Sequence, residues 1–180
     1  ERGGLAALRL GGRALLPIVQ GGMGVGGSAH KLAGNVASLG GVGTISSVDL
    51  RRHHPDLMER TQGLASRPGM DADTKAVIDA ANLEAIGREI RAARVLSEGR
   101  GLLAINVMRA VSEYGHSVTR ALECGIDAVV VGAGLPLDLD ANPRGGVGVR
   151  GGGPRRGRPG RSCGGKRSRR LGRRAAAEHG

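Results

Sequence analysis

A glycine-rich stretch directly behind a predicted strand offers the clearest chemistry in this chain. The sequence Gly21-Gly22-Met23-Gly24 follows the apolar run at residues 15–20 and leads into a helical pattern of small residues. Backbone without side chains lets a ligand lie directly on main-chain N–H groups, which is how many phosphate and flavin sites begin. We therefore expect Gly21, Gly22 and Met23 to bind a ligand.

Three further predicted strands end in small or polar residues. These ends are Thr44-Ile45-Ser46-Ser47, Ile105-Asn106-Val107-Met108 and Val130-Val131-Gly132-Ala133-Gly134-Leu135-Pro136. The carboxyl ends of parallel strands share one face, and active sites of α/β proteins form there. Asn106, Met108, Gly132 and Ala133 are therefore further candidates for ligand binding, although glycine also serves tight turns without touching a ligand.

Four segments carry a resemblance to a known family. Taken in order, Pro17–Gly24, Gly40–Ser46, Asn106–Met108 and Gly132–Pro136 resemble the nitronate monooxygenase family, formerly called 2-nitropropane dioxygenase. The resemblance covers residues 8–139 and stops there. Members of this family are FMN-dependent TIM-barrel flavoproteins that oxidise alkyl nitronates with O₂ to a carbonyl compound and nitrite, so the resemblance implies this fold, cofactor and activity.

The resemblance also implies which residues contact the cofactor. The main chain of Gly21, Gly22 and Met23 would lie against the flavin, with Asn106 and Met108 near its ring or ribityl chain, although the family often has a hydroxylic residue where Met108 stands. Many members use a histidine from an Ala-Gly-Gly-His-like loop after a later strand, and barrels commonly hold phosphate after strands seven and eight. This sequence contains neither feature, so we assign no catalytic residue.

The apolar pattern predicts an α/β protein, because strand-like runs alternate with helical patterns. The predicted strands are residues 15–20, 42–46, 102–107 and 126–131. The predicted helices are residues 28–39, 74–98 and 111–123. Ser28 and Asp73 are good N-cap residues for the first two helices. The first helix is expected to bury one apolar face, made of Ala29, Leu32, Ala33, Val36 and Leu39.

The region between the second strand and the second helix, residues 47–72, is predicted to be a long loop with one turn near residues 56–58. About four β/α units are therefore visible, which is half of a (β/α)₈ barrel, and a complete barrel needs roughly 250 residues. We expect a truncated chain of 180 residues with weak or no activity. Its exposed barrel edges favour self-association.

Composition separates residues 1–140, the half-barrel, from a Gly/Arg-rich tail at residues 141–180. The tail carries 12 of the 27 Lys and Arg residues and a single acid, Glu178, so it accounts for the net charge of +11. With so few large aliphatic residues it is expected to be disordered. It is either an out-of-frame translation of GC-rich DNA, an inert extension, or a nucleic-acid-binding segment. Nucleic-acid binding is the least favoured, because the tail has no aromatic residue for base stacking.

Two other oxidoreductase classes compete with the nitronate monooxygenase interpretation. Residues 22–27 satisfy the dinucleotide-binding pattern G-x-G-x-x-G, and Asp49 follows the third glycine by 22 residues. The position of Asp49 is poor, because a ribose-binding acid should end the second strand. Flavin-dependent enoyl reductases also look similar over the same region, and they use NAD(P)H on an enoyl thioester.

The sequence limits the cellular location and the remaining chemistry of the protein only broadly. No apolar stretch approaches the roughly 20 residues of a membrane span, and nothing resembles a signal peptide, so we expect a cytoplasmic protein without membrane contact. Cys124 and Cys163 form neither a disulfide framework nor a metal-binding spacing. The histidines lie apart from any recognisable catalytic motif, and only His30 is near the glycine-rich stretch. A histidine at the start of a helix is more often structural than catalytic.

Overall fold

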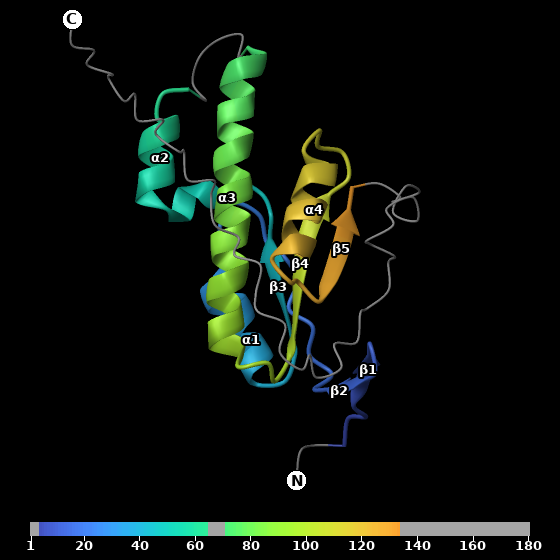
Figure 1. Ribbon diagram of the computed structural model, residues 1–180. Helices are drawn as coiled ribbons and strands as arrows, with labels where there is room; N and C mark the ends of the chain where they lie inside the picture. Colours follow the sequence, from blue (N-terminus) through green and yellow to red (C-terminus); the bar gives the residue numbers. More distant parts are fainter. Residues whose placement is uncertain (1–3, 65–70, 134–180) are drawn as a thin grey trace, which may run out of the picture.

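A short parallel sheet with helices forms the protein in a computed structural model that describes residues 4–64 and 71–133 (Figure 1). The strands are β3 (Val42–Ser46), β4 (Leu102–Met108) and β5 (Ala128–Gly132), in the order β3-β4-β5. β4 pairs in parallel with both neighbours. These three strands confirm the predicted ones, with β5 beginning two residues later than expected. The described residues form a mixed α/β structure with no closed barrel.

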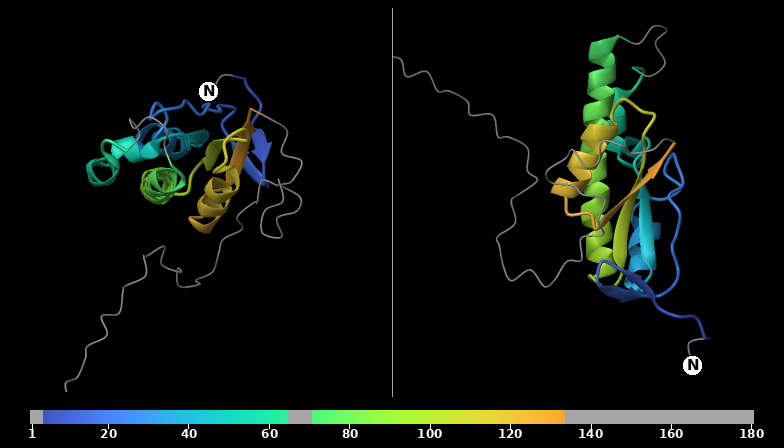
Figure 2. Two further views of the ribbon diagram at one scale, coloured as in Figure 1. Left: turned by 90° about the horizontal axis from the view of Figure 1, so that it is seen from above. Right: turned by 90° about the vertical axis from the view of Figure 1, so that its right-hand side faces the viewer.

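Helices cover one face of this sheet. They are α1 (His30–Ser38), α3 (Ala72–Ser97) and α4 (Tyr114–Glu123), and in the right-hand view of Figure 2 α3 and α4 lie on one side of the strands. Their buried side chains share one core with the strand residues Ile45, Leu103, Ile105 and Val107. Because side chains alternate along a strand, Val42, Thr44 and Ser46 face the opposite side.

The packing of α1 differs from the predicted apolar face. Its buried residues are Ala33, Gly34 and Ala37, whereas Leu39 is 75% exposed. The reason is the close approach of α1 to β3, since a Cβ at Gly43 would lie 1.8 Å from the carbonyl oxygen of Ala33. Only small residues fit such a contact, so the large aliphatic residues of α1 point elsewhere.

The second face of the sheet carries a small apolar core at its amino end. An antiparallel hairpin of β1 (Leu8–Leu10) and β2 (Arg13–Leu15) lies there. Its apolar side chains complete a second small core with the sheet, made of Leu15, Val42, Leu102 and Ala104, with Leu8, Leu10 and Ala128 packed against it. Beyond this core the same face becomes polar toward the carboxyl ends of the strands.

The predicted first strand at residues 15–20 is wrong. Leu15 ends β2, and residues 16–20 run beside β3 with a single parallel bridge between Val19 and Val42. Two hydrogen bonds of 2.9 Å hold this segment, from Gln20 N–H to the Val42 carbonyl and from Val42 N–H to the Ile18 carbonyl. Pro17 supplies no N–H, and proline is tolerated only at the edge of a sheet, so the segment stays irregular.

The long loop predicted at residues 47–72 is wrong over residues 50–61, where the turn expected near residues 56–58 is part of a longer helix, and residues 65–70 lie outside the described residues. The region contains a 3₁₀ helix, η1 (Leu50–His53), and α2 (Pro55–Thr61). Pro55 stands at the start of α2, where its missing N–H costs nothing. Leu50 and Leu57 are fully buried and join the main core. Such short helices lack the two or more turns from which an apolar period can be recognised.

Two helix starts were misplaced by a few residues. The N-cap of α3 is Asp71 instead of Asp73, and its carboxylate accepts the Thr74 N–H at 2.7 Å. The helix predicted from residue 111 begins at Tyr114.

The predicted tail at 141–180, its boundary near residue 140 and the segment Gly134–Pro136 lie outside the described residues. No described helix is long and apolar enough to cross a membrane.

Candidate ligand site at the carboxyl end of the sheet

The glycine-rich loop is closed by the side chain of Ser28. The Ser28 hydroxyl is fully buried and accepts the Met23 N–H at 2.9 Å. It also lies 3.3 Å from the Gly21 carbonyl, to which it donates. The prediction that Ser28 caps α1 is therefore wrong, because the N-cap is Ala29 and the hydroxyl holds the loop instead.

Gln20 joins this loop to the sheet. Its side-chain Oε1 accepts the Thr44 N–H at 2.9 Å, and its Nε2 donates to the Thr44 carbonyl at 3.1 Å and to Ser28 Oγ at 3.0 Å. The carboxamide thus takes the place of a neighbouring strand at the edge of β3, where the backbone of Thr44 needs partners. This contact sets the position of the loop relative to the strand ends.

Gly22 and Asn106 form the centre of the candidate site. A Cβ at Gly22 would lie 2.5 Å from Asn106 Cβ, so no side chain fits at residue 22. Asn106 Nδ2 donates a long hydrogen bond of 3.4 Å to the Gly22 carbonyl. A Cβ at Gly132 would lie 3.7 Å from Asn106 Oδ1. Three of the predicted residues, far apart in sequence, therefore meet at the carboxyl ends of β4 and β5.

The other predicted residues surround this centre more loosely. Met108 pairs in register with Gly132 and is 38% exposed on the same face as Asn106. Met23 is 64% exposed, and its Cβ would lie 3.2 Å from a Cβ placed at Gly27. Ala133 follows β5 with a φ of 56°, a left-handed conformation.

The loop retains hydrogen-bonding capacity for a ligand. Within residues 4–64 and 71–133, the N–H groups of Gly21 and Gly22 donate to no acceptor. Gly21 is exposed and Gly22 is half-buried. Two adjacent N–H groups that have no acceptor among the described residues, beside an asparagine carboxamide, can bind the carbonyl and amide edge of a planar heterocycle.

Two buried hydroxyl groups of β3 belong to a strand end noted in the sequence but were not proposed as ligand-binding residues. Thr44 and Ser46 are each 1% exposed and lie on the same face as Asn106, with Ser46 in register with Asn106. Ser46 N–H donates to the Ser28 carbonyl at 2.9 Å. The alternation of Val42, Thr44 and Ser46 along one strand is the signal that could have identified them.

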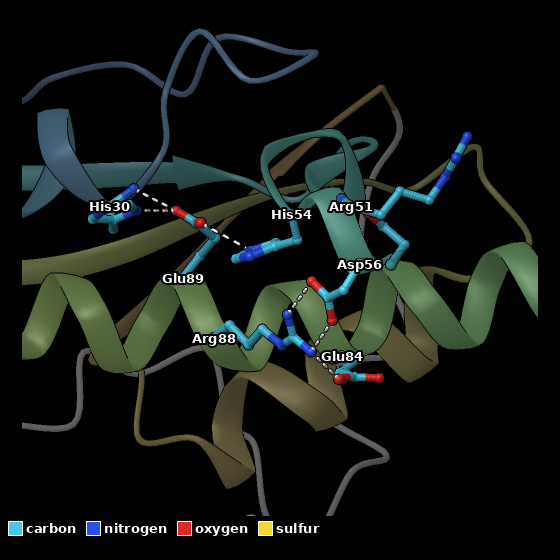
Figure 3. Close-up of polar contacts among 8 residues, drawn as sticks. His30, Arg51, His54, Asp56, Glu84, Arg88 and Glu89 are labelled. Atoms are coloured by element: carbon cyan, nitrogen blue, oxygen red, sulfur yellow. Dashed lines mark hydrogen bonds and ion pairs between the residues drawn. The ribbon is translucent and has the colours of Figure 1, made fainter. Parts of the chain in front are cut away.

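A buried carboxylate lies beneath the glycine-rich loop (Figure 3). Glu89 of α3 is 1% exposed, and its Oε2 accepts the backbone N–H of His30 at 2.7 Å and lies 2.8 Å from His30 Nδ1. Its Oε1 lies 3.1 Å from His54 Nε2, without hydrogen-bond geometry. Glu89 thus connects the starts of α1 and α2 to the middle of α3. An acidic residue among the apolar residues of α3 was the feature of the sequence that could have identified Glu89 as buried.

A more exposed ionic network joins α2 to α3 (Figure 3). Arg88 pairs with Asp56 at 2.7 Å and with Glu84 at 2.6 Å, and Arg60 pairs with Glu84 at 2.9 Å. The hydrogen bond from Arg88 lowers the pKa of Asp56. The hydrogen bond from Arg60, followed by that from Arg88, lowers the pKa of Glu84. The same carboxylates raise the pKa of Arg88.

The site is chemically suited to binding and orienting a ligand. Within the part of the chain that the structure describes, no group of three His, Cys, Asp or Glu side chains is placed to hold a metal ion. The available groups are backbone N–H donors, the Asn106 carboxamide and buried hydroxyls. Comparison of the chain with protein-family models and with curated proteins returned no match.

Proposed function

We propose that the carboxyl end of the sheet is an FMN site and that the chain represents the amino-terminal half of a nitronate monooxygenase-like TIM-barrel flavoprotein. The observation that carries this proposal is the contact of Gly22 with Asn106. It brings a loop whose Gly21 and Gly22 N–H groups have no acceptor in the described part of the chain onto a strand end that carries a carboxamide. Such an arrangement fits the polar edge of a flavin ring, which both donates and accepts hydrogen bonds.

The residues of the chain fit the ring of this cofactor. The main chain of Gly21 and Gly22 would donate to it, and Asn106 would orient it, while Met23 and Met108 offer exposed apolar side chains for its faces. Gly132 and Ala133 would border it at the end of β5. FMN itself supplies the redox chemistry, which is the oxidation of an alkyl nitronate with O₂ to a carbonyl compound and nitrite.

The arrangement of strands supports the half-barrel part of the proposal. Residues 16–20, β3, β4 and β5 are neighbours in chain order, and all of their pairings are parallel. Sequential parallel neighbours are the arrangement of a β/α barrel. Doubly wound sheets instead reverse their strand order at the ligand site.

The dinucleotide-binding interpretation is less well supported. The acid that should bind a ribose, Asp49, is already paired with Arg51 at 2.9 Å and with Arg52. Asp49 also stands at the cap of η1, three residues beyond the end of β3. In a nucleotide-binding unit this acid is free at the end of the second strand.

Flavin titration of the full chain tests the proposal. Quenching of FMN fluorescence is expected on binding, and NAD⁺ should not compete with FMN. Nitrite release from a nitronate, measured beside NAD(P)H consumption with an enoyl thioester, separates the monooxygenase from an enoyl reductase. Absence of any flavin binding would contradict the proposed function, and enoyl reduction without nitrite release would assign the other flavoenzyme class.

We also propose that the chain self-associates through its open sheet edges. β5 has only one neighbouring strand among the described residues, and Val130 at this edge is 45% exposed. Val19 beside the opposite edge is 59% exposed. Unprotected edges of this kind pair with other strands. Sedimentation should show concentration-dependent association that is weakened by Val130→Lys, and a monomer at every concentration would contradict this.

A further inference from the structure

The carboxylate of Glu89 takes the place at the start of α1 that an anion would otherwise occupy. α1 begins directly after the glycine-rich loop, and a helix that follows such a loop normally presents free N–H groups and positive potential to a phosphate. Here the first N–H of the helix, that of His30, donates to Glu89 Oε2 at 2.7 Å. Figure 3 shows this carboxylate between His30 and His54.

The carboxylate belongs to the interior of the protein. Glu89 is 1% exposed, its Oε2 lies 2.8 Å from His30 Nδ1, and its Oε1 lies 3.1 Å from His54 Nε2. A phosphate at the same helix start would have to displace a buried, paired carboxylate or lie beside its negative charge. Both are unfavourable, because like charges in a buried site repel strongly.

We propose that Glu89 is an internal anion that closes the start of α1 to phosphate, so that the glycine-rich loop receives the uncharged ring of its ligand. The identity of the ring as a flavin rests on the proposed function, whereas the closure by Glu89 does not. A direct consequence is that the phosphate of FMN must be bound away from the start of α1. Glu89 is therefore a determinant of specificity at this site.

The test of the closure uses small anions without any flavin. Glu89→Ala removes the carboxylate and leaves space at the start of α1, and Glu59→Ala on α2 removes an exposed carboxylate as the control. Thermal unfolding is measured in acetate or inorganic phosphate and in chloride of equal ionic strength. Acetate or phosphate is expected to raise the melting temperature of Glu89→Ala and not that of wild type or the control. Equal shifts in all three proteins would overturn the closure.

Glu89→Gln keeps the shape of the side chain, and it tests the proposal even if Glu89→Ala does not fold. Loss of the charge is expected to increase pyrophosphate affinity by roughly fivefold over wild type, because the positive potential of the helix start is no longer neutralised. Pyrophosphate binding that is unchanged in Glu89→Gln would contradict the proposal.

A competition experiment tests where the ligand ring lies. Riboflavin, which has no phosphate, is titrated into the wild-type chain with and without pyrophosphate. Pyrophosphate should not displace it, and displacement would show that the loop accepts phosphate and would overturn the inference. If wild type binds no riboflavin or FMN, the proposed function fails. The acetate and pyrophosphate results on the Glu89 variants still decide the closure by themselves.

Discussion

Gly22 lies so close to Asn106 that a Cβ on the glycine would be 2.5 Å from the Cβ of the asparagine. Real Cβ atoms do not approach so closely, so any side chain at residue 22 would push the loop away from β4. The contact joins residues 84 positions apart in the chain. It is therefore both a constraint on the loop and the geometric centre of the candidate site.

Gly22→Ala is expected to destabilise the protein by about 1–3 kcal/mol, as overpacking does, and to abolish flavin binding because the loop moves. Gly24→Ala is the matched control, since a Cβ at Gly24 meets nothing within 4 Å. Urea unfolding and FMN titration of both variants check this. Equal behaviour of the two variants would show that the close contact with Asn106 has no consequence.

Asn106→Ala is expected to weaken flavin binding by roughly tenfold while changing the free energy of unfolding by less than about 1 kcal/mol. The small effect on stability follows from the length of its hydrogen bond to the Gly22 carbonyl, 3.4 Å. Fluorescence titration and urea unfolding measure the two quantities. A loss of stability without a loss of flavin affinity would make Asn106 a structural residue only.

Ser28→Ala is expected to loosen the glycine-rich loop and to cost about 1–3 kcal/mol, because a buried hydroxyl that serves Met23, Gly21 and Gln20 is removed. Ser112→Ala, at an exposed hydroxyl, should change stability by less than about 0.5 kcal/mol. Hydrogen exchange of residues 21–28 should accelerate only in the first variant. Unchanged exchange there would mean that Ser28 does not hold the loop.

Acid should remove the stabilisation that the Arg88 network provides. The folded-state pKa values of Asp56 and Glu84 are lowered from 3.8 and 4.5. Their contribution is therefore complete above these ordinary values and is lost as the pH falls through the lower, folded-state values. Arg88→Met should reduce the melting temperature at neutral pH, with a difference from wild type that shrinks in acid and at high salt.

Arg91→Met is the control for this network. Arg91 is an exposed arginine of the same helix, and it forms no ion pair with any described residue, so its removal changes net charge by the same amount. Its melting temperature should follow that of wild type at every pH. If Arg88→Met and Arg91→Met lose stability equally, the acid dependence reflects net charge and not the pairs with Asp56 and Glu84.

Local patterns in the sequence were sufficient for the strands of the sheet and for the longest helix. The runs that became β4 and β5 are rich in aliphatic residues, which is visible without knowledge of neighbours, although β4 is largely buried and β5 only half-buried. The gathering of Gly22, Asn106 and Gly132 was also predictable, since each follows or ends a strand and parallel strands end together. The short helices η1 and α2 were not predictable, because each has too few turns for a helical period of apolar residues to be recognised.

The sequence by itself determined the strands β3, β4 and β5, the helices α1, α3 and α4 to within a few residues, and which chemical groups stand at the strand ends, because these depend on residues close together in the chain. Only the tertiary structure decided how Ser28 and Glu89 are used. Ser28 serves the loop instead of the helix start because Glu89, 59 residues away from His30, already accepts the first N–H of α1. A hydrogen bond between distant residues leaves no local pattern, so the partner of a helix start is settled only when the helices pack together.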